Sequence, residues 1–448
     1  MEAIAVQRPG SISAPVLIGA GVLVAAILSG CGEPPDALGG REGIVGDQAV
    51  RAVDPFIGTG GHGHVYPGAS VPFGMVQLSP DNGRGGWDWV AGYHWSDSVI
   101  VGFSHTHLSG TGIGDLLDVL VAPIGQEPDL TTPVDSDRDQ PWASRFSHDR
   151  ESASPGVYAV DLLDSGIRAE LTATPRVGVH RYTFPEGTTP GLVIDLGYAQ
   201  NWDSPTSVAL EIHGDTLLTG RRFSTGWARD QRLFFAMAAD RPVRRVVVSS
   251  DGGEAVGLGE RDPRGAPGEA RREGTRLRAY VEFGPSPGND PLELRLALSY
   301  VDEVGAAENL RAEAPVPGFD TYRTAARRSW SEALAGVEVE GGTPEQRRIF
   351  YTSLYRTKLA PILFQDVDGR YRGGDGEVHR ADGFVNHSLF SRWDTFRTAH
   401  PLYTLTDADR VGHMVASMLA FGDEAGALPV WTLVGSETNT MTGIHALP

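Results

Sequence analysis

Short apolar runs separated by turn residues dominate the chain from about Val53 to Pro315. Runs rich in β-branched, aromatic or alternating apolar residues, a pattern typical of strands, occur at LFFAMAA (233–239), RRVVVSS (244–250), RAYVEFG (278–284) and LRLALSYV (294–301). The stretch GVYAVDLLDSGIRAELTATPRVGVHRYTFP (156–185) holds at least three more, with DSG as a turn. This pattern predicts an antiparallel β-sandwich of many strands over residues 53–315.

The apolar spacing changes to a helical period after residue 315. Residues 319–337 are predicted as a helix, within a helical linker at 316–342. A second helix is predicted to begin after Thr343, with Thr343 as N-cap, Pro344 at the first helical position and Gln346 at the third, a capping-box arrangement. Its expected apolar stripe consists of Ile349, Phe350, Leu354 and Leu359.

A third helix is predicted to begin near Thr406 and to end at Gly422. Its apolar positions follow the i, i+3, i+4, i+7, i+8 spacing, at Val411, Met414, Val415, Met418 and Leu419. Residues 343–448 are therefore predicted to be the start of a helical domain. No closing element is predicted before Pro448, so we expect this domain to be incomplete.

Composition limits the class of protein. The 448 residues suffice for about two or three domains. A net charge of −19 repels phosphate backbones and argues against a nucleic-acid partner. The high content of glycine (57) and proline (30) favours many short strands over a helical bundle. The polar, charged stretch 259–275 is expected to form a mobile hairpin loop.

The first residues indicate export. Arg8 precedes the apolar run APVLIGAGVLVAAIL, which is too short for a comfortable membrane span and is predicted as a signal peptide over residues 1–30. The run ends in LSGC, which resembles a bacterial lipobox, and Cys31 is the only cysteine. We therefore expect a lipid anchor on Cys31 and a flexible tether at 31–52. The protein would then be membrane-anchored, in the periplasm or at the cell surface.

The stretch GFSHTHLSGTGIGD (102–115) is a candidate for several kinds of site. It has no lysine and is followed by a strand-like segment, so it does not fit a phosphate-binding loop. His105 and His107 have a spacing that puts both on one side of a strand, and His62 and His64 repeat it. Two such pairs could form a zinc site, although no third ligand has a recognisable spacing. The zinc site stays open as an alternative, as do purely structural histidines.

Aromatic residues near this stretch favour a sugar site. GGWDWVAGYHW (85–95) places three tryptophans and a tyrosine in a glycine-flanked loop. Aromatic rings pack on the apolar C–H faces of sugars, while carboxylates and amides bind the hydroxyls. SRWDTFRTAHPL (391–402) sets Trp393 beside Asp394, with Arg392 and Arg397 nearby. The alternatives are a tryptophan cluster in the sandwich core and a structural Asp–Arg salt bridge.

Five long blocks follow one another along the chain: VDPFIGTGGHGHVYPGASVPFGMVQLSPD (53–81), GWDWVAGYHWSDSVIVGFSHTHLSGTGIGDLLD (86–118), ELTATPRVGVHRYTFP (170–185), SRWDTFRTAHPL (391–402) and GSETNTMTGIHALP (435–448). In this order they resemble glycoside hydrolase family 92, the calcium-dependent exo-acting α-mannosidases of bacteria. The likeness covers nearly all of the chain after about residue 52.

The resemblance implies a β-sandwich joined by helices to a catalytic (α/α)6 barrel, with the active site between them. It also implies inversion at the anomeric carbon by a glutamic acid and an aspartate base about 6.5–9.5 Å apart. A Ca²⁺ ion, held by oxygen ligands, would contact the mannose. Trp87 matches the family's sugar-contacting tryptophan, and Asp394 matches its hydroxyl-binding aspartate. Trp393, His105 and His107 are further candidates for contacts with the sugar, or for the two histidines with the domain interface.

One departure from the family limits the prediction. The acid lies in a Tyr-x-Glu-Gly-Asn element and the base in a Gly-Asn-Asp-Asp-x-Gly element, and neither string occurs in these 448 residues. Glu437 belongs to another block and is not assigned as a substitute. We therefore expect a catalytically inactive N-terminal fragment whose acid, base and main calcium ligands, none of them assigned, lie beyond Pro448.

The leading prediction is a lipid-anchored α-mannosidase fragment that acts on mannose-containing glycans, such as those on glycoproteins. One rival is a non-catalytic carbohydrate-binding surface lipoprotein. Another is an enzyme completed by a partner chain or interrupted by a misplaced stop codon.

Overall fold

The computed structural model describes residues 46–131, 137–259, 270–284, 290–443 and 445–446. The predicted signal peptide, Cys31 and the tether up to residue 45 lie outside these residues. Residues 46–52, the end of the predicted flexible tether, are helical, which corrects that part of the prediction. Ala49 and Val50 are buried in a cluster with Trp330, and this burial explains why the segment is ordered as a helix.

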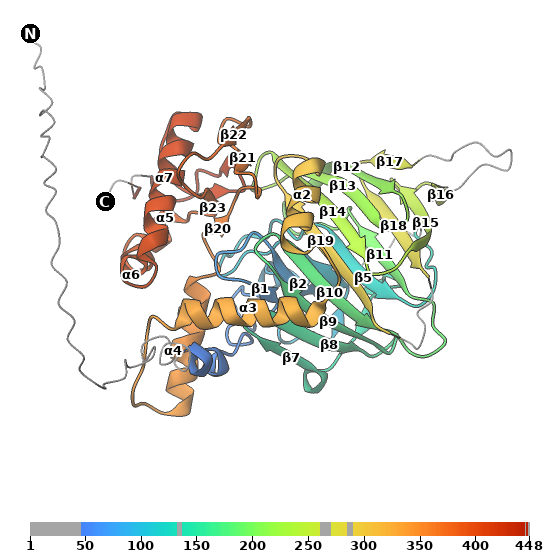
Figure 1. Cartoon of the computed structure of the whole chain (residues 1–448), viewed down its shortest axis with the longest axis horizontal. Helices are drawn as coiled ribbons and strands as arrows, with labels where there is room; N and C mark the ends of the chain where they lie inside the picture. The colour runs from blue at the N-terminus through green and yellow to red at the C-terminus, as the bar shows by residue number, and fades with distance from the viewer. Residues whose placement is uncertain (1–45, 132–136, 260–269, 285–289, 444, 447–448) are drawn as a thin grey trace, which may run out of the picture.

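Two antiparallel sheets pack face to face and form the predicted sandwich (Figure 1). In order across the first sheet, the strands are β1 (Ala69–Ser70), β2 (Gln77–Asp81), β4 (Gly102–Ser104), β5 (Leu120–Ile124), β11 (Gly191–Asp195), β18 (Leu277–Phe283), β15 (Val243–Ser250) and β16 (Val256–Leu258). In order across the second sheet, they are β17 (Arg271–Gly274), β12 (Ser204–His213), β13 (Leu217–Thr225), β14 (Gln231–Ala239), β19 (Leu292–Ser299), β10 (Val177–Thr183), β9 (Ile167–Ala173), β8 (Val157–Leu162) and β7 (Glu151–Ser154).

The core lies between the sheets because alternate residues of each strand point to the same face. Leu78, Phe103 and Val121 of the first sheet belong to one buried cluster with Leu171 and Leu210 of the second. All seven strands predicted from the apolar runs are present, as β8, β9, β10, β14, β15, β18 and β19. The prediction of a hairpin loop over 259–275 is wrong for its last residues, because Arg271–Gly274 forms strand β17. Residues 260–269 of this stretch lie outside the described part.

Two helices cover the outer face of the second sheet (Figure 1). The first, α2 (Glu303–Glu313), packs Ala306 and Leu310 on the sheet, and α3 (Phe319–Leu334) adds Phe319 and Tyr322. The predicted start of α3 at Phe319 is confirmed, although the helix ends at Leu334 and not at Val337, and α2 was not predicted. Asp302 caps α2 by accepting the backbone N–H of Gly305 at 2.6 Å. This short helix has only two apolar positions on the sheet, a pattern too weak to separate from the strand-like region before it.

The helix α4 (Pro344–Thr357) begins as predicted, with a capping box between Thr343 and Gln346. Of its predicted apolar stripe, Leu354 and Leu359 are buried as expected, but Ile349 and Phe350 are exposed. Tyr351 and Tyr355 are buried in their place. Tyr355 packs on Trp330 of α3, with ring centroids 4.5 Å apart. Packing of these large aromatic rings, rather than the aliphatic spacing, decides which side of α4 faces α3.

The remaining residues form a smaller part with mixed structure (Figure 1). Its helices are α5 (Arg392–Thr395), α6 (Ala399–Thr406) and α7 (Ala408–Ala425). Its strands pair as β20 (Ile362–Leu363) with β23 (His387–Ser388), β21 (Arg370–Arg372) with β22 (Val378–Arg380), and β24 (Thr432–Leu433) with β25 (Ser436–Glu437). The predicted end of α7 at Gly422 is wrong, because the helix continues to Ala425 and is terminated by Gly426 in the left-handed conformation.

Three further short helical turns, η1 (Trp87–Trp89), η2 (Asp137–Asp139) and η3 (His148–Arg150), and the strand pair β3 (Val99–Ile100) with β6 (Ser144–Arg145) lie in the loops of the sandwich. In the part of the chain that the structure describes, no helix is long and apolar enough to cross a membrane.

Buried polar contacts join the sandwich to the smaller part. Asp366, which follows β20, accepts hydrogen bonds from Ser299 of β19 and Asn309 of α2, both at 2.7 Å. Lys358, the only lysine in the sequence, is closed to solvent, and its Nζ lies 2.5 Å from a carboxylate oxygen of Asp407 at the start of α7. The carbonyl of Lys358 also accepts the backbone N–H of Phe73 at 2.7 Å. These contacts fix the orientation of α7 relative to the sandwich.

Candidate functional site

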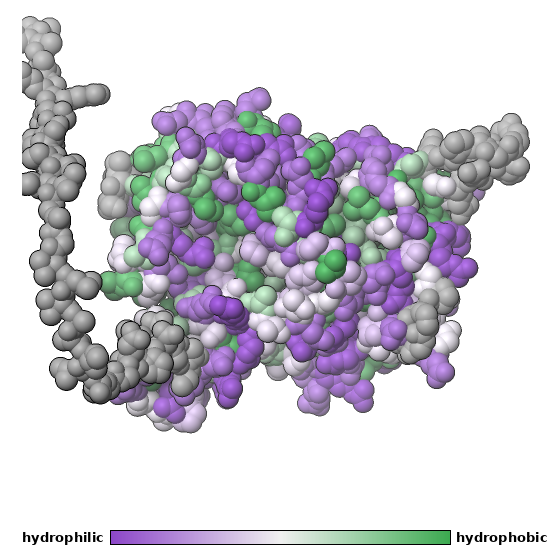
Figure 2. Space-filling model, in the orientation of Figure 1, coloured by the Kyte–Doolittle hydropathy of each residue, from purple (hydrophilic) through white to green (hydrophobic). Residues whose placement is uncertain are grey.

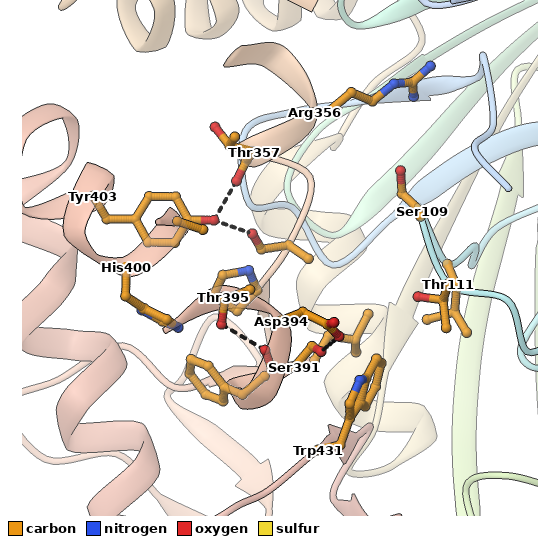
Figure 3. A pocket seen from close by; sticks show the side chains of 17 residues that line it. Ser109, Thr111, Arg356, Thr357, Ser391, Asp394, Thr395, His400, Tyr403 and Trp431 are labelled. Atoms are coloured by element: carbon orange, nitrogen blue, oxygen red, sulfur yellow. Dashed lines mark hydrogen bonds between the residues drawn. The ribbon is translucent and has the colours of Figure 1, made fainter. Parts of the chain in front are cut away.

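A cavity of about 330 Å³ lies where the sandwich meets the smaller part (Figure 3). This volume is at the lower end of the range of small-molecule sites. The lining residues come from one sandwich loop, from the end of α4 and the segment after it, from α5 and the three residues before it, from α6, and from the residue before β24. They are Leu108, Ser109, Gly110, Thr111, Arg356, Thr357, Ala360, Pro361, Leu389, Phe390, Ser391, Asp394, Thr395, Ala399, His400, Tyr403 and Trp431.

The sandwich side of the cavity is the loop Leu108–Thr111, which continues the stretch that begins at β4. Gly110 has a φ of 76°, a left-handed conformation that favours glycine. Its N–H donates to the carbonyl of His64 at 2.7 Å, which fixes the turn. Figure 3 shows Ser109 and Thr111 on this side of the cavity. The loop thus supplies two hydroxyl groups.

On the opposite side, Asp394 and Trp431 lie close together (Figure 3). Asp394 is on α5, is exposed to solvent, and accepts a short hydrogen bond from the hydroxyl of Ser391. Ser391 forms a β-bridge with Trp431, so the carboxylate and the indole are held by one local structure. A carboxylate beside an aromatic ring is an arrangement that suits a polyol: the ring packs on C–H groups and the carboxylate accepts from hydroxyls.

The base of the cavity is held by Tyr403 and His400 of α6. The Tyr403 hydroxyl donates to the carbonyls of Thr357 at 2.6 Å and Ala360 at 3.0 Å. Burial and then the nearby Arg392 guanidinium lower the pKa of His400 to about 4. His400 is therefore neutral at pH 7, and its Nε2 accepts from Nη1 of Arg392 at 2.8 Å. Both contacts orient α5 and α6 around the cavity.

Trp87, on η1, lies beside the cavity loop and keeps 56% of its surface exposed. Its Nε1–H donates to the carbonyl of Gly112 at 2.7 Å, one residue after the loop. The His64 ring meets the indole edge-on at 4.3 Å, and His62, which is paired with Asp88 at 2.6 Å, lies 5.2 Å from it. The indole is thus exposed yet fixed in orientation. Its supports include the two histidines that the sequence suggested as a metal pair.

His105 and His107 are not in the site, which corrects the prediction that they contact sugar or the domain interface. Their exposed fractions are 0% and 2%, and neither lines the cavity. His105 lies 3.0 Å from His180 between their Nε2 atoms, and its Nδ1 contacts the carbonyl of Val119 at 2.8 Å. His107 contacts Asp81 at 3.2 Å. Both join segments of the sandwich, because the whole segment 103–107 is buried.

The structure also places the remaining residues that were predicted to bind sugar or metal. Trp87 and Asp394 lie at or beside the cavity, as described above. Trp393 is 37% exposed but does not line the cavity. Within the described ranges, no group of three or more histidine, cysteine, aspartate or glutamate residues could hold a metal ion, so the two histidine pairs do not assemble the alternative zinc site there.

Two tryptophans that were not predicted as site residues shape the cavity. Trp431 lines it, and Trp227, on the turn between β13 and β14, packs on Trp431 with ring centroids 4.3 Å apart. The backbone N–H groups of Trp227 and Ala228 donate to Oδ2 of Asp115 at 2.6 and 3.2 Å. The aspartate that ends GFSHTHLSGTGIGD therefore positions the support of a cavity residue. No local pattern connects three residues so far apart in sequence.

Asp115 should make the stability of this region depend on pH. Burial, together with the nearby Asp203, raises its pKa to about 7, more than its three backbone N–H donors lower it. The folded state then holds the proton more tightly than the unfolded state, so its stabilising effect is full below about pH 4 and is lost as pH rises through about 7. Relative to Asp115→Asn, the wild-type free energy of unfolding should fall by up to about 1.4 kcal/mol per pH unit in that window. Urea unfolding of both chains at a series of pH values measures this, and parallel curves would contradict it.

Comparisons with known proteins agree with this arrangement. Two family models match: the glycosyl hydrolase family 92 N-terminal domain over residues 52–299 and the glycosyl hydrolase family 92 catalytic domain over residues 305–448. A curated relative from Arthroderma benhamiae, described as an uncharacterized secreted glycosidase, is 30% identical over 346 residues, covering 71% of this chain and 42% of the relative.

Solved structures of α-mannosidases are also similar. A family 92 α-mannosidase from Bacteroides thetaiotaomicron is 34% identical with a TM-score of 0.82, over 89% of this chain and 53% of that chain. Its complex with mannoimidazole gives a TM-score of 0.81. A family 92 inverting mannosidase from the same organism is 28% identical with a TM-score of 0.75, over 89% and 51%. The chain thus spans about half the length of these proteins.

Proposed function

Because the chain belongs to glycosyl hydrolase family 92, we propose that the cavity between the sandwich and the smaller part is the mannose-binding site of an α-mannosidase-type glycosidase. The observation that carries this proposal is the placement of Trp87, an exposed indole held by Gly112 beside the cavity loop. Asp394 supplies a solvent-exposed carboxylate from the opposite side. The complex of a similar α-mannosidase with mannoimidazole supports the choice of mannose.

In this proposal each residue has a distinct role. The Trp87 ring packs on the C–H face of the sugar, and Asp394 accepts hydrogen bonds from its hydroxyls. Ser109 and Thr111 offer further hydroxyl contacts from the sandwich loop. Trp431 closes the cavity, backed by Trp227. The ligands we propose are mannose-containing glycans, such as those carried by glycoproteins.

A calcium ion, which the family resemblance implies, is not matched by the residues described. Ca²⁺ takes six to eight oxygen ligands, usually with several carboxylates. Among the described residues that line the cavity, Asp394 is the one carboxylate, and no cluster of three or more candidate ligands could hold a metal in that part of the chain. No step is therefore assigned to the ion here.

We propose that the 448-residue chain binds mannose but does not hydrolyse its glycosides. An inverting glycosidase needs two carboxyl groups that flank the scissile bond, and the described cavity lining offers only Asp394. Glu437 is not available as the second, because its carboxylate accepts the backbone N–H groups of Val430, Trp431 and Asn439 at 2.8 to 3.0 Å. Its role is to shape the β24 hairpin.

The expected result is no mannose release when the purified chain is incubated with an α-linked mannobiose, with or without added Ca²⁺. Released mannose is measured with a coupled assay, and a heat-denatured sample is the control. Clear turnover that depends on Ca²⁺ would contradict the proposed inactivity. The same outcome would exclude the alternative that this chain is a non-catalytic carbohydrate-binding lipoprotein.

The location and the helical fold are also proposals. We propose export with a lipid anchor at Cys31, supported by the LSGC sequence and by the relative described as a secreted glycosidase. We further propose that α4 to α7 are the first part of an (α/α)6 barrel. The surface over the region of α5 to α7 carries hydrophobic residues (Figure 2). On α7, Val415 and Leu419 are 45% and 56% exposed, so two of the five residues of its apolar stripe are not covered by the described residues.

A further inference from the structure

Trp202 is an exposed tryptophan that the proposed mannose site does not use. It lies in the loop between β11 and β12, and 60% of its surface is exposed. Its indole makes no hydrogen bond and no ring contact with any other residue that the structure describes. A single exposed apolar residue is ordinary on a protein surface, so its meaning depends on how the loop is held and where it lies.

The loop is held on both sides of Trp202. Gln200, nearly buried, donates from Nε2 to the carbonyl of Trp89 at 2.5 Å. Asn201 has a φ of 54° and packs on Gly114, where a Cβ atom would lie 2.8 Å from its side chain. Asp203 is buried and paired with Arg222. The backbone is therefore fixed immediately before and after Trp202, while the ring remains in solvent.

The loop also lies next to the proposed mannose site. Along one segment, Thr111 lines the cavity, Gly112 holds the Trp87 indole, and Gly114 contacts Asn201. Three residues span at most about 11 Å, so the loop of Trp202 packs within that distance of the cavity wall. Gln200 contacts η1, the same turn that carries Trp87. Trp87 and Trp202 are thus exposed rings on adjoining loops at one end of the sandwich.

We propose that Trp202 forms a second sugar subsite, which binds a residue of the glycan beyond the mannose in the cavity. The inference rests on the proposed function and deepens it: the ligand is an oligosaccharide rather than a monosaccharide. An aromatic ring in a fixed loop binds a pyranose face with little loss of conformational freedom, because the loop is already ordered. The cavity of about 330 Å³ has room for a small ligand such as one sugar, so further sugars must lie on the surface outside it.

The test compares the binding of mannose, an α-linked mannobiose and longer α-linked mannose oligosaccharides to the full chain by isothermal titration calorimetry. In the wild type, affinity should rise with length. In Trp202→Ala, affinity for the longest ligand should fall about three- to tenfold, while affinity for mannose stays the same. Phe350→Ala, which removes a similarly exposed ring on α4, is the matched control and should change neither value.

The outcomes separate this inference from the proposed function. If the wild type binds mannose but its affinity does not rise with length, or if Trp202→Ala keeps the wild-type dependence on length, the second subsite is wrong and the mannose site stands. If the wild type binds none of these sugars, both proposals are overturned. An unchanged urea-unfolding midpoint in Trp202→Ala confirms that the loss is local, whereas equal weakening for every ligand would assign Trp202 a structural role and contradict the inference.

Discussion

Trp87→Ala should abolish retention of the chain on immobilised α-linked mannose oligosaccharides, with a loss in affinity of roughly tenfold or more. The indole is a large exposed apolar surface beside the cavity loop, and its orientation is fixed by the hydrogen bond to Gly112 and by the edge of His64. Removal of the ring deletes the surface on which the sugar packs, yet few core contacts are lost because more than half of Trp87 is in solvent. Affinity chromatography and calorimetry measure the effect.

Gly112→Ala is a finer version of the same experiment. A Cβ atom at Gly112 would lie 3.2 Å from the Trp87 ring, so the indole must move slightly although it remains in place. A partial loss is expected, smaller than that of Trp87→Ala. Equal retention of wild type, Gly112→Ala and Trp87→Ala would show that the sugar site does not include this ring.

Arg222→Met should cause the largest loss of stability, about 3–5 kcal/mol in the free energy of unfolding. Arg222 is completely buried between the sheets and donates from Nη1 to Asp118 at 2.6 Å and from Nη2 to Asp203 and to the carbonyl of Tyr198. Burial alone would disfavour its charge, but Asp203 and Asp118 outweigh burial and raise the pKa of Arg222 above its usual value. The substitution leaves two buried carboxylates without their cation.

The control for this prediction is Arg232→Met on the neighbouring strand β14. Arg232 is partly exposed and paired with Asp230 at 3.1 Å, and such surface pairs contribute little. Its loss should change the free energy of unfolding by no more than about 0.5 kcal/mol. Denaturant unfolding measures both variants. A cost below 1 kcal/mol for Arg222→Met would mean that the buried network does not need its cation.

The sandwich could be predicted because its information is local. Strands such as β15 and β18 alternate apolar residues with the period of a pleated strand, and turn residues separate them. The capping box at Thr343 is a four-residue signal and was found for the same reason. The face of α4 was mispredicted because two sides of that helix are apolar, and only contact with Trp330 selects the aromatic one.

The site was only partly predictable. Trp87 and Asp394 were found through family blocks, since nothing local shows that residue 87 lies beside the cavity that residue 394 lines. The histidines at 105 and 107 misled because a glycine-rich surrounding suggested an exposed loop. Their actual role depends on His180 and Asp81, which are distant in sequence. Trp227 and Trp431 meet across 204 residues, a contact that only the fold creates.

The buried pair of Lys358 with Asp407 has a practical consequence for chemical labelling. Since this is the only lysine, the folded chain presents no side-chain amine to reagents that acylate amino groups. Lysine-directed biotinylation or crosslinking therefore requires the contact between the end of α4 and the start of α7 to open. The extent of acylation at this one position becomes a direct count of molecules in which the start of α7 has separated from the end of α4.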